Sequence, residues 1–218
     1  MKKYSFRPET HEYFINGARV PSVTQVLPYN FYGNESENKR LIGQYVHRMI
    51  ELHDCNNLDE DTLHPVLRGY LKSYKLLTDF RKGNPVWKRM GQSNYLPGKE
   101  NVICDYKTGV RHPCVELQLA GYYILVTEGV TENGNIVPGT YNELSLFHPI
   151  YLFAGTIDYL HYETAEKAIQ IKAIYLKEDG SIPQIEDYTK GLRRSTQVFL
   201  SFLTCYKWRK EKNISWKQ

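Results

Sequence analysis

Residues 101–122, NVICDYKTGVRHPCVELQLAGY, decide how the chain folds. An apolar run leads into Asp105 and Lys107 and predicts a buried strand. Thr108 and Gly109 end this strand, and Pro113 fits the first turn of a helix. Apolar or aromatic residues recur at helical spacing after Pro113, namely Val115, Leu119, Tyr122 and Val126. The stretch therefore predicts a strand, a tight turn and an amphipathic helix.

The charged residues at the end of this strand are predicted to point to the same face. Asp105 and Lys107 are two residues apart, and side chains alternate along a strand. Gln118 and Tyr122 are four residues apart, so they share one face of the helix. A carboxylate and an amine fixed side by side suit a metal ion and the water that it activates. The alternative is a surface ion pair, which is common and contributes little to stability.

Two further motifs place polar residues on predicted regular elements. Gly43-x-x-x-His47-x-x-x-Glu51 lies in a predicted helix and puts His47 and Glu51 on one face. A single histidine on a helix is more often structural than functional. Gly155-x-x-Asp158 lies on a predicted strand and is a weak signal by itself. The motifs become informative when they are taken together.

The combination of Asp105-x-Lys107, the helical Gln118-x-x-x-Tyr122 and the other two motifs resembles the signature of RecB-like nucleases of the PD-(D/E)XK superfamily. Residues 6–27, FRPETHEYFINGARVPSVTQVL, are similar to the N-terminus of phage-type exonucleases of this kind. The resemblance implies a restriction-endonuclease-like core with a central mixed β-sheet flanked by helices. It also implies metal-dependent hydrolysis of DNA.

The resemblance assigns a metal site to residues from three motifs. Asp105 and Asp158, helped by His47, would hold one or two metal ions. The backbone carbonyl of Cys104 or Tyr106 would complete the coordination. Oxygen ligands of this kind favour Mg²⁺ or Mn²⁺ over zinc.

The same resemblance gives roles to the residues around the metal. Lys107 would orient the attacking water or stabilise the charge that develops during the reaction. Gln118 and Tyr122 would position the substrate strand or the lysine. Glu51 would orient its neighbours. Glu143 matches an acidic position on the strand that precedes the Gly-x-x-Asp strand.

The order of the motifs differs from the family pattern, in which the Gly-x-x-Asp strand precedes the Asp-x-Lys strand. Here Asp158 follows Lys107 in the chain. The difference resembles an exchange of two adjacent blocks, about residues 88–138 and 139–162. A metal site needs its ligands together in space, so an exchange through polar loops could preserve it. Alternatively, Asp158 is a coincidental strand end and the second acidic ligand is Glu143 or Glu116.

Composition limits the protein class without identifying a function. The chain has 218 residues, enough for one domain with a hydrophobic core, and a net charge of +4, which is compatible with a nucleic-acid partner. No apolar run approaches the roughly 18 residues of a membrane span, and the start is not a signal peptide, so we expect a cytoplasmic protein. The four cysteines form no CxxC pair, and the C-terminal grouping of iron–sulphur nucleases is missing, so we expect no cluster.

We expect an α/β fold in a single nuclease-like domain over residues 1–218. Asn16-Gly17 predicts the turn of an N-terminal β-hairpin. Turn-forming residues predict a loop at 88–99. The expected parts are the hairpin within 1–27, a helical part at 36–82, a sheet core that carries the site at 100–177, and a C-terminal helix at 184–212.

The predicted C-terminal helix ends in basic residues, among them Lys207, Arg209 and Lys210. Cations at a helix C-terminus interact favourably with the helix dipole. The alternative is a segment that contacts DNA, and the sequence favours neither explanation.

The function that we infer from the sequence is an Mg²⁺-dependent deoxyribonuclease, an exonuclease in recombination, repair or phage DNA processing. Its partner would be DNA, with a homo-oligomer or a recombination protein as further partners and no membrane association. Two other hypotheses remain: a catalytically inactive nucleic-acid-binding protein on a nuclease scaffold, and a structural or interaction protein.

Overall fold

The structure, a computed structural model, describes residues 2–27, 37–81, 101–166 and 168–214. The loop predicted at 88–99 lies outside the described residues. Among the helices of the described part, none combines the length and the apolar character that crossing a membrane requires.

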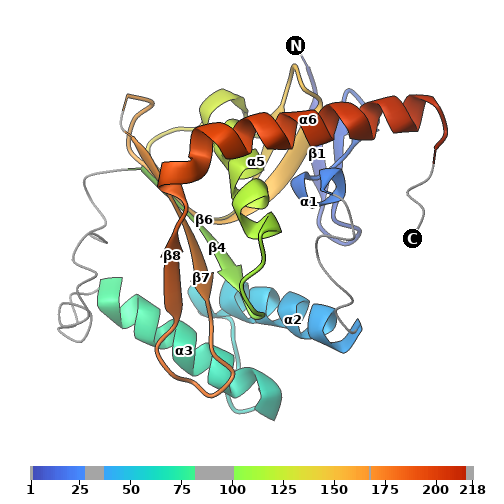
Figure 1. Ribbon diagram of the computed structural model, residues 1–218. Coiled ribbons are helices and arrows are strands. Elements are labelled where there is room, and N and C mark those ends of the chain that lie inside the picture. Colours follow the sequence, from blue (N-terminus) through green and yellow to red (C-terminus); the bar gives the residue numbers. More distant parts are fainter. Residues whose placement is uncertain (1, 28–36, 82–100, 167, 215–218) are drawn as a thin grey trace.

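A five-stranded mixed sheet forms the centre of the molecule (Figure 1). Its order across the sheet is β5 (Gly139–His148), β6 (Phe153–Tyr162), β4 (Asn101–Lys107), β7 (Ile169–Tyr175) and β8 (Gln184–Asp187). Strand β4 is antiparallel to β6 and parallel to β7, and the outer pairs are antiparallel. As the apolar run predicts, β4 is buried along almost its whole length, because it has neighbours on both sides.

A second, smaller sheet is formed by the N-terminal residues. It contains β1 (Tyr4–Arg7), β2 (Glu12–Ile15) and β3 (Ala18–Val20), all antiparallel. The predicted hairpin between β2 and β3 is confirmed. Its turn residues Asn16 and Gly17 have φ angles of 53° and 77°, the left-handed conformation that a two-residue hairpin turn requires. Strand β1 adds a third strand to the predicted pair.

Helices cover both faces of the central sheet (Figure 1). On one face lie α1 (Val23–Val26), α5 (Cys114–Glu128) and α6 (Leu192–Glu211), which share an apolar core with the sheet. On the other face lie α2 (Glu37–Asp54) and α3 (Pro65–Arg81), with a core of their own against β4 and β7. The α/β fold with a mixed sheet between helices is therefore confirmed.

The predicted helix at 184–212 is wrong over its first eight residues. Residues 184–187 form β8 instead, and a short 3₁₀ turn, Thr189–Gly191, precedes α6. In β8, Ile185 pairs with Ile174 of β7 and packs against the core below the sheet. The carboxylate of Asp187 then accepts a hydrogen bond from the amide of Thr189 at 2.9 Å, which turns the chain into α6.

The close packing of α5 against α6 depends on a glycine. A Cβ atom at Gly121 would lie 2.8 Å from Phe199 Cε2 and 2.8 Å from Val23 Cγ1. Both of these side chains are buried in the core, so neither has space to move away. We expect Gly121→Ala to destabilise the fold by about 1–3 kcal/mol, despite the better helix propensity of alanine.

The control for this substitution is Gly43→Ala, which makes the same change inside helix α2. Among the described residues, a Cβ atom there would meet Thr108 Oγ1 at 3.4 Å, an ordinary contact distance. We expect this variant to gain up to about 1 kcal/mol from helix propensity. Urea unfolding of both variants measures the difference, and equal effects would contradict the packing argument.

The connection between β5 and β6 is held by a buried imidazole. His148 Nδ1 accepts hydrogen bonds from the amides of Ile150 and Tyr151 at 3.2 and 3.0 Å, so the ring must be neutral at Nδ1. Burial lowers the pKa of His148 from its ordinary value of 6.5. The unfolded chain therefore takes up this proton more readily, and the stability that the neutral ring provides is lost as the pH falls below about 6.5.

We expect His148→Asn to remove this part of the pH dependence, because asparagine offers an acceptor oxygen that does not titrate. The melting temperature of the parent should fall more between pH 7.5 and 5.5 than that of the variant. Parallel pH profiles for the two proteins would show that His148 is not the titrating group.

Candidate functional site

Asp158 lies where two neighbouring strands of the sheet separate. The antiparallel pairs between β4 and β6 end at Cys104 and Tyr159. Beyond this point, the amide of Tyr106 donates a hydrogen bond to Asp158 Oδ2 at 2.6 Å. The Gly-x-x-Asp strand is thus hydrogen-bonded directly to the Asp-x-Lys strand, although β4 precedes β6 in the sequence.

A chain of polar contacts runs from β4 to α5. Lys107 Nζ lies 2.6 Å from Asp105 Oδ2, which confirms that the two side chains share one face of the strand. The same ammonium donates a hydrogen bond to Gln118 Oε1 at 2.9 Å. Gln118 Nε2 in turn donates to the hydroxyl of Tyr122 at 2.9 Å. The two predicted pairs therefore form one connected group, in which the lysine is held from both sides.

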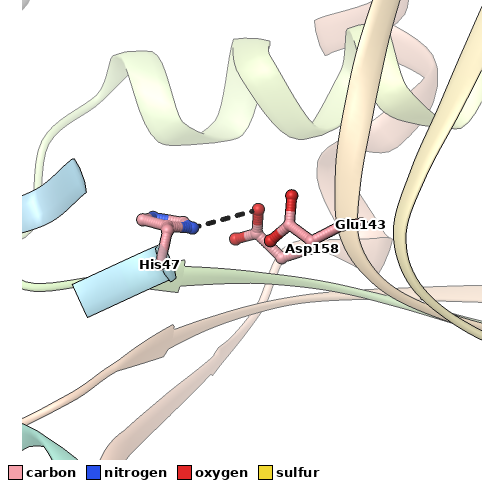
Figure 2. A group of neighbouring side chains, drawn as sticks. All are labelled: His47, Glu143 and Asp158. Carbon is pink, nitrogen blue, oxygen red and sulfur yellow. Dashed lines mark ion pairs between the residues drawn. The ribbon is translucent and has the colours of Figure 1, made fainter. Parts of the chain in front are cut away.

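A second group consists of His47, Glu143 and Asp158, which come from α2, β5 and β6 (Figure 2). One ligand atom from each of the three side chains lies within 4.8 Å of the others. His47 Nδ1 is 3.3 Å from Asp158 Oδ1, the ion pair drawn in Figure 2. The helical histidine is thus part of the site and not an isolated surface residue.

Glu143 reaches this group through an unusual backbone conformation. Strand β5 pairs with β6 at Asn142 and at Leu144, and Glu143 between them has a φ angle of +53°. A left-handed conformation is uncommon for a residue other than glycine and costs on the order of 1 kcal/mol. Strain of this kind is concentrated at functional positions, where the surrounding structure maintains it.

The charges of the site shift one another's pKa values. Burial and the nearby Asp158 raise the pKa of Glu143 to about 8. Burial alone would lower the pKa of His47, but Asp158 raises it to about 9. Burial raises the pKa of Asp105 to about 6 against the opposing effect of Lys107. Although burial works in the opposite direction, His47 holds the pKa of Asp158 below its ordinary value. The site is therefore a buried set of mutually dependent charges.

Both groups line one cavity of about 760 Å³. Three basic residues of α2, Lys39, Arg40 and Arg48, line the same cavity beside His47. Its lining also includes His11 from the loop between β1 and β2. The cavity thus combines acidic groups with basic groups around them, an arrangement that suits a phosphate ester and a cation.

The donor set fits a divalent cation with oxygen preference. Two ligands on opposite sides of an ion with bonds of about 2.1 Å are about 4.2 Å apart, so ligand atoms of His47, Glu143 and Asp158 that lie within 4.8 Å of one another need to move closer by only a small amount to share one ion. Burial and, to a smaller extent, Asp158 raise the pKa of Glu143, and a cation beside both carboxyl groups would stabilise the ionised form of Glu143. Asp105 lies outside this group of three and is paired with Lys107.

Several other predicted site residues lie at the margin or elsewhere. Glu51 lines the cavity but pairs with Arg48 at 2.5 Å. Glu116, an alternative acidic ligand in the sequence, accepts a hydrogen bond from Ser195 on α6 and is not among the residues that line this cavity. Cys104, whose backbone carbonyl is a predicted metal ligand, is buried in the centre of the sheet. Lys207 and its basic neighbours line a different cavity.

The N-terminal sheet contributes residues to the site that the sequence did not suggest. The buried hydroxyl of Tyr13 forms hydrogen bonds with His11 Nε2 at 3.0 Å and with Thr156 Oγ1 at 2.8 Å. Thr156 lies two residues before Asp158 on β6, and its hydroxyl also contacts Ser145 at 2.9 Å. The available signal was the similarity of residues 6–27 to exonuclease N-termini, from which we predicted a β-hairpin and no site residue.

Comparisons with protein-family models, with curated proteins and with solved structures give no match to this chain. The residues of the site and their geometry are therefore the basis on which a function is proposed.

We expect Mn²⁺ to raise the melting temperature of the parent protein, because an ion that binds only the folded state stabilises it. Glu143→Gln should weaken Mn²⁺ binding at least about tenfold. The same change should raise the melting temperature of the metal-free protein, because it removes a carboxyl group beside Asp158. If Glu143 had only a structural role, its substitution would not weaken Mn²⁺ binding and at the same time raise the melting temperature of the metal-free protein.

The matched control is Asp61→Asn, which changes an exposed carboxylate outside the cavity. Melting curves at increasing Mn²⁺ concentration, with reversal by EDTA, give the affinities. A parent protein whose melting temperature does not respond to millimolar Mn²⁺ would contradict the metal site.

Proposed function

We propose that the chain is a metal-dependent deoxyribonuclease of the RecB-like PD-(D/E)XK type, with a restriction-endonuclease-like core. The observation that carries this proposal is the position of Asp158. The sequence places it after Lys107, in the wrong order for the family, yet its carboxylate accepts a hydrogen bond from the amide of Tyr106 between the two predicted catalytic residues of β4. This contact favours a role for Asp158 in the site over a coincidental strand end.

The topology of the sheet supports the same proposal. Strand β6 lies beside β4, and helix α5 follows β4 directly in the chain. An exchange of two blocks would change the order of the strands along the chain while leaving their order across the sheet intact. Residues 129–138 join α5 to β5 outside any helix or named strand, where a rearranged connection is tolerated most easily. The altered motif order is therefore compatible with an intact site.

The residues of the cavity fit the hydrolysis of a phosphodiester. A bound Mg²⁺ or Mn²⁺ would lower the pKa of a water molecule and neutralise charge on the phosphate. Lys107 keeps its proton because Asp105 lies 2.6 Å away, so its ammonium can donate to the attacking water or to a phosphate oxygen. Gln118 holds the ammonium in place, and Tyr122 holds Gln118.

The first test compares cleavage of end-labelled linear DNA and closed circular DNA in Mg²⁺, Mn²⁺ or EDTA. We expect loss of the linear form only, as an exonuclease requires, and no loss in EDTA. Lys107→Ala and Asp158→Asn should each reduce the rate about 100-fold or more, since each removes charge stabilisation or a metal ligand.

Two control variants change the same residue types at exposed positions outside the cavity, Lys190→Ala and Asp61→Asn. Both should retain the parent rate. Activity that survives Asp158→Asn but not Lys107→Ala would remove Asp158 from the site. A folded parent protein that cleaves neither substrate with either metal would favour the inactive nucleic-acid-binding protein or the structural protein.

A further inference from the structure

A second cavity of about 1210 Å³ lies between the C-terminal turns of α6 and the segment that joins β3 to α1. We call it the α6 groove. Figure 1 shows α6 passing over α1 and the N-terminal sheet on this side of the molecule. One wall is formed by Tyr206, Lys207 and Lys210 of α6, and the other by Arg19 of β3. The groove is an open channel with walls from two parts of the chain.

The α6 groove is strongly basic. Its lining contains the cations Arg19, Lys207, Arg209 and Lys210, and among the described residues Glu211 is its single carboxylate. Burial lowers the pKa of Lys207, which shows that its charge is poorly solvated in the wall. An anion in the groove would therefore be stabilised by several cations at once.

The helix dipole explains only part of this arrangement. It accounts for cations in the last turn of α6. It does not account for Arg19, which extends from the opposite wall with more than half of its side chain exposed while pairing with Glu12 at 3.1 Å. Cations on both walls indicate a ligand whose negative charge extends along the groove.

An aromatic ring accompanies the charges. Tyr206 lines the groove and is partly buried, and Lys210 Nζ lies 5.8 Å from the centre of its ring. Alternating cations and aromatic rings are how proteins bind single-stranded nucleic acids, because bases stack on rings while phosphates contact the cations. A duplex would offer no exposed base to the ring.

The α6 groove adjoins the candidate site. Thr24 of α1 lines both the groove and the cavity that holds Asp105, Lys107 and Asp158. The two cavities therefore meet at α1, so the groove lies next to a polymer that occupies the site.

We propose that the α6 groove binds the single-stranded DNA that extends from the site, an inference that rests on the proposed nuclease function. Lys207, Lys210 and Arg19 contact its phosphates, and Tyr206 stacks on a base. The groove would hold the strand while the reaction takes place in the neighbouring cavity.

The test measures binding of fluorescent oligothymidylates of about 4 and about 16 nucleotides in EDTA, where no cleavage occurs. The parent should bind the longer strand more tightly. A double variant, Lys207→Ala with Lys210→Ala, should bind the longer strand about tenfold more weakly at low salt. Its salt dependence, the slope of log K against log salt, should decrease by about 1.4, which corresponds to two phosphate contacts. Tyr206→Leu should weaken binding about tenfold while leaving this slope unchanged.

The control is Arg193→Ala with Lys190→Ala, which removes two exposed charges near the other end of α6. Unchanged affinity of the groove variants for the longer strand would overturn the inference. An equal loss for both lengths would also overturn it, because the groove would then not extend the site. Binding is measured without metal, so a failure of the groove inference is distinct from a failure of the nuclease proposal, which would show as absent cleavage.

Discussion

The hydrogen bond from the Tyr106 amide to Asp158 determines the geometry of the site. It lies where β4 and β6 part, so it fixes the carboxylate beside the face of β4 that carries Asp105 and Lys107. Strand β4 is itself held on its other side by seven consecutive pairs with β7. Asp105 and Lys107 are therefore positioned by a central strand that is paired on both sides.

The site also illustrates why buried charges need one another. An isolated carboxylate in the interior would cost several kcal/mol, and a charge that loses its partner costs almost as much. Here Lys107 offsets Asp105, and His47 offsets Asp158. Glu143 shares His47 with Asp158, its pKa is raised to about 8 despite this cation, and its backbone is strained as well. A sequence selected for stability alone would not retain such a residue at this position, whereas a site that binds a cation would.

The parts of the structure that the sequence predicted are those with strong local signals. The strand with Asp105 and Lys107 follows from a continuous apolar run, and the Asn16-Gly17 turn has a specific backbone requirement. The helix after this strand was predicted at the right place but as an amphipathic helix, whereas α5 is buried on almost all sides between the sheet and α6. The strand at 184–187 could not be predicted, because it is short, polar and defined only by pairing with β7. The contribution of His11 depends equally on tertiary contacts, since only the folded chain brings the N-terminal sheet to β6.

The order in which the chain forms its strands has a consequence for folding. Strand β4 is synthesised before β6 and β7, the two strands that pair with it. Strands β5 and β6 are adjacent in the chain and can form their hairpin locally. Strand β4 can pair only after the chain has been synthesised about fifty residues further, because its partners lie that far along the sequence. Until then its apolar segment remains unpaired on both edges. We expect the nascent chain to be most vulnerable to aggregation during this interval, when the central strand exists without its sheet.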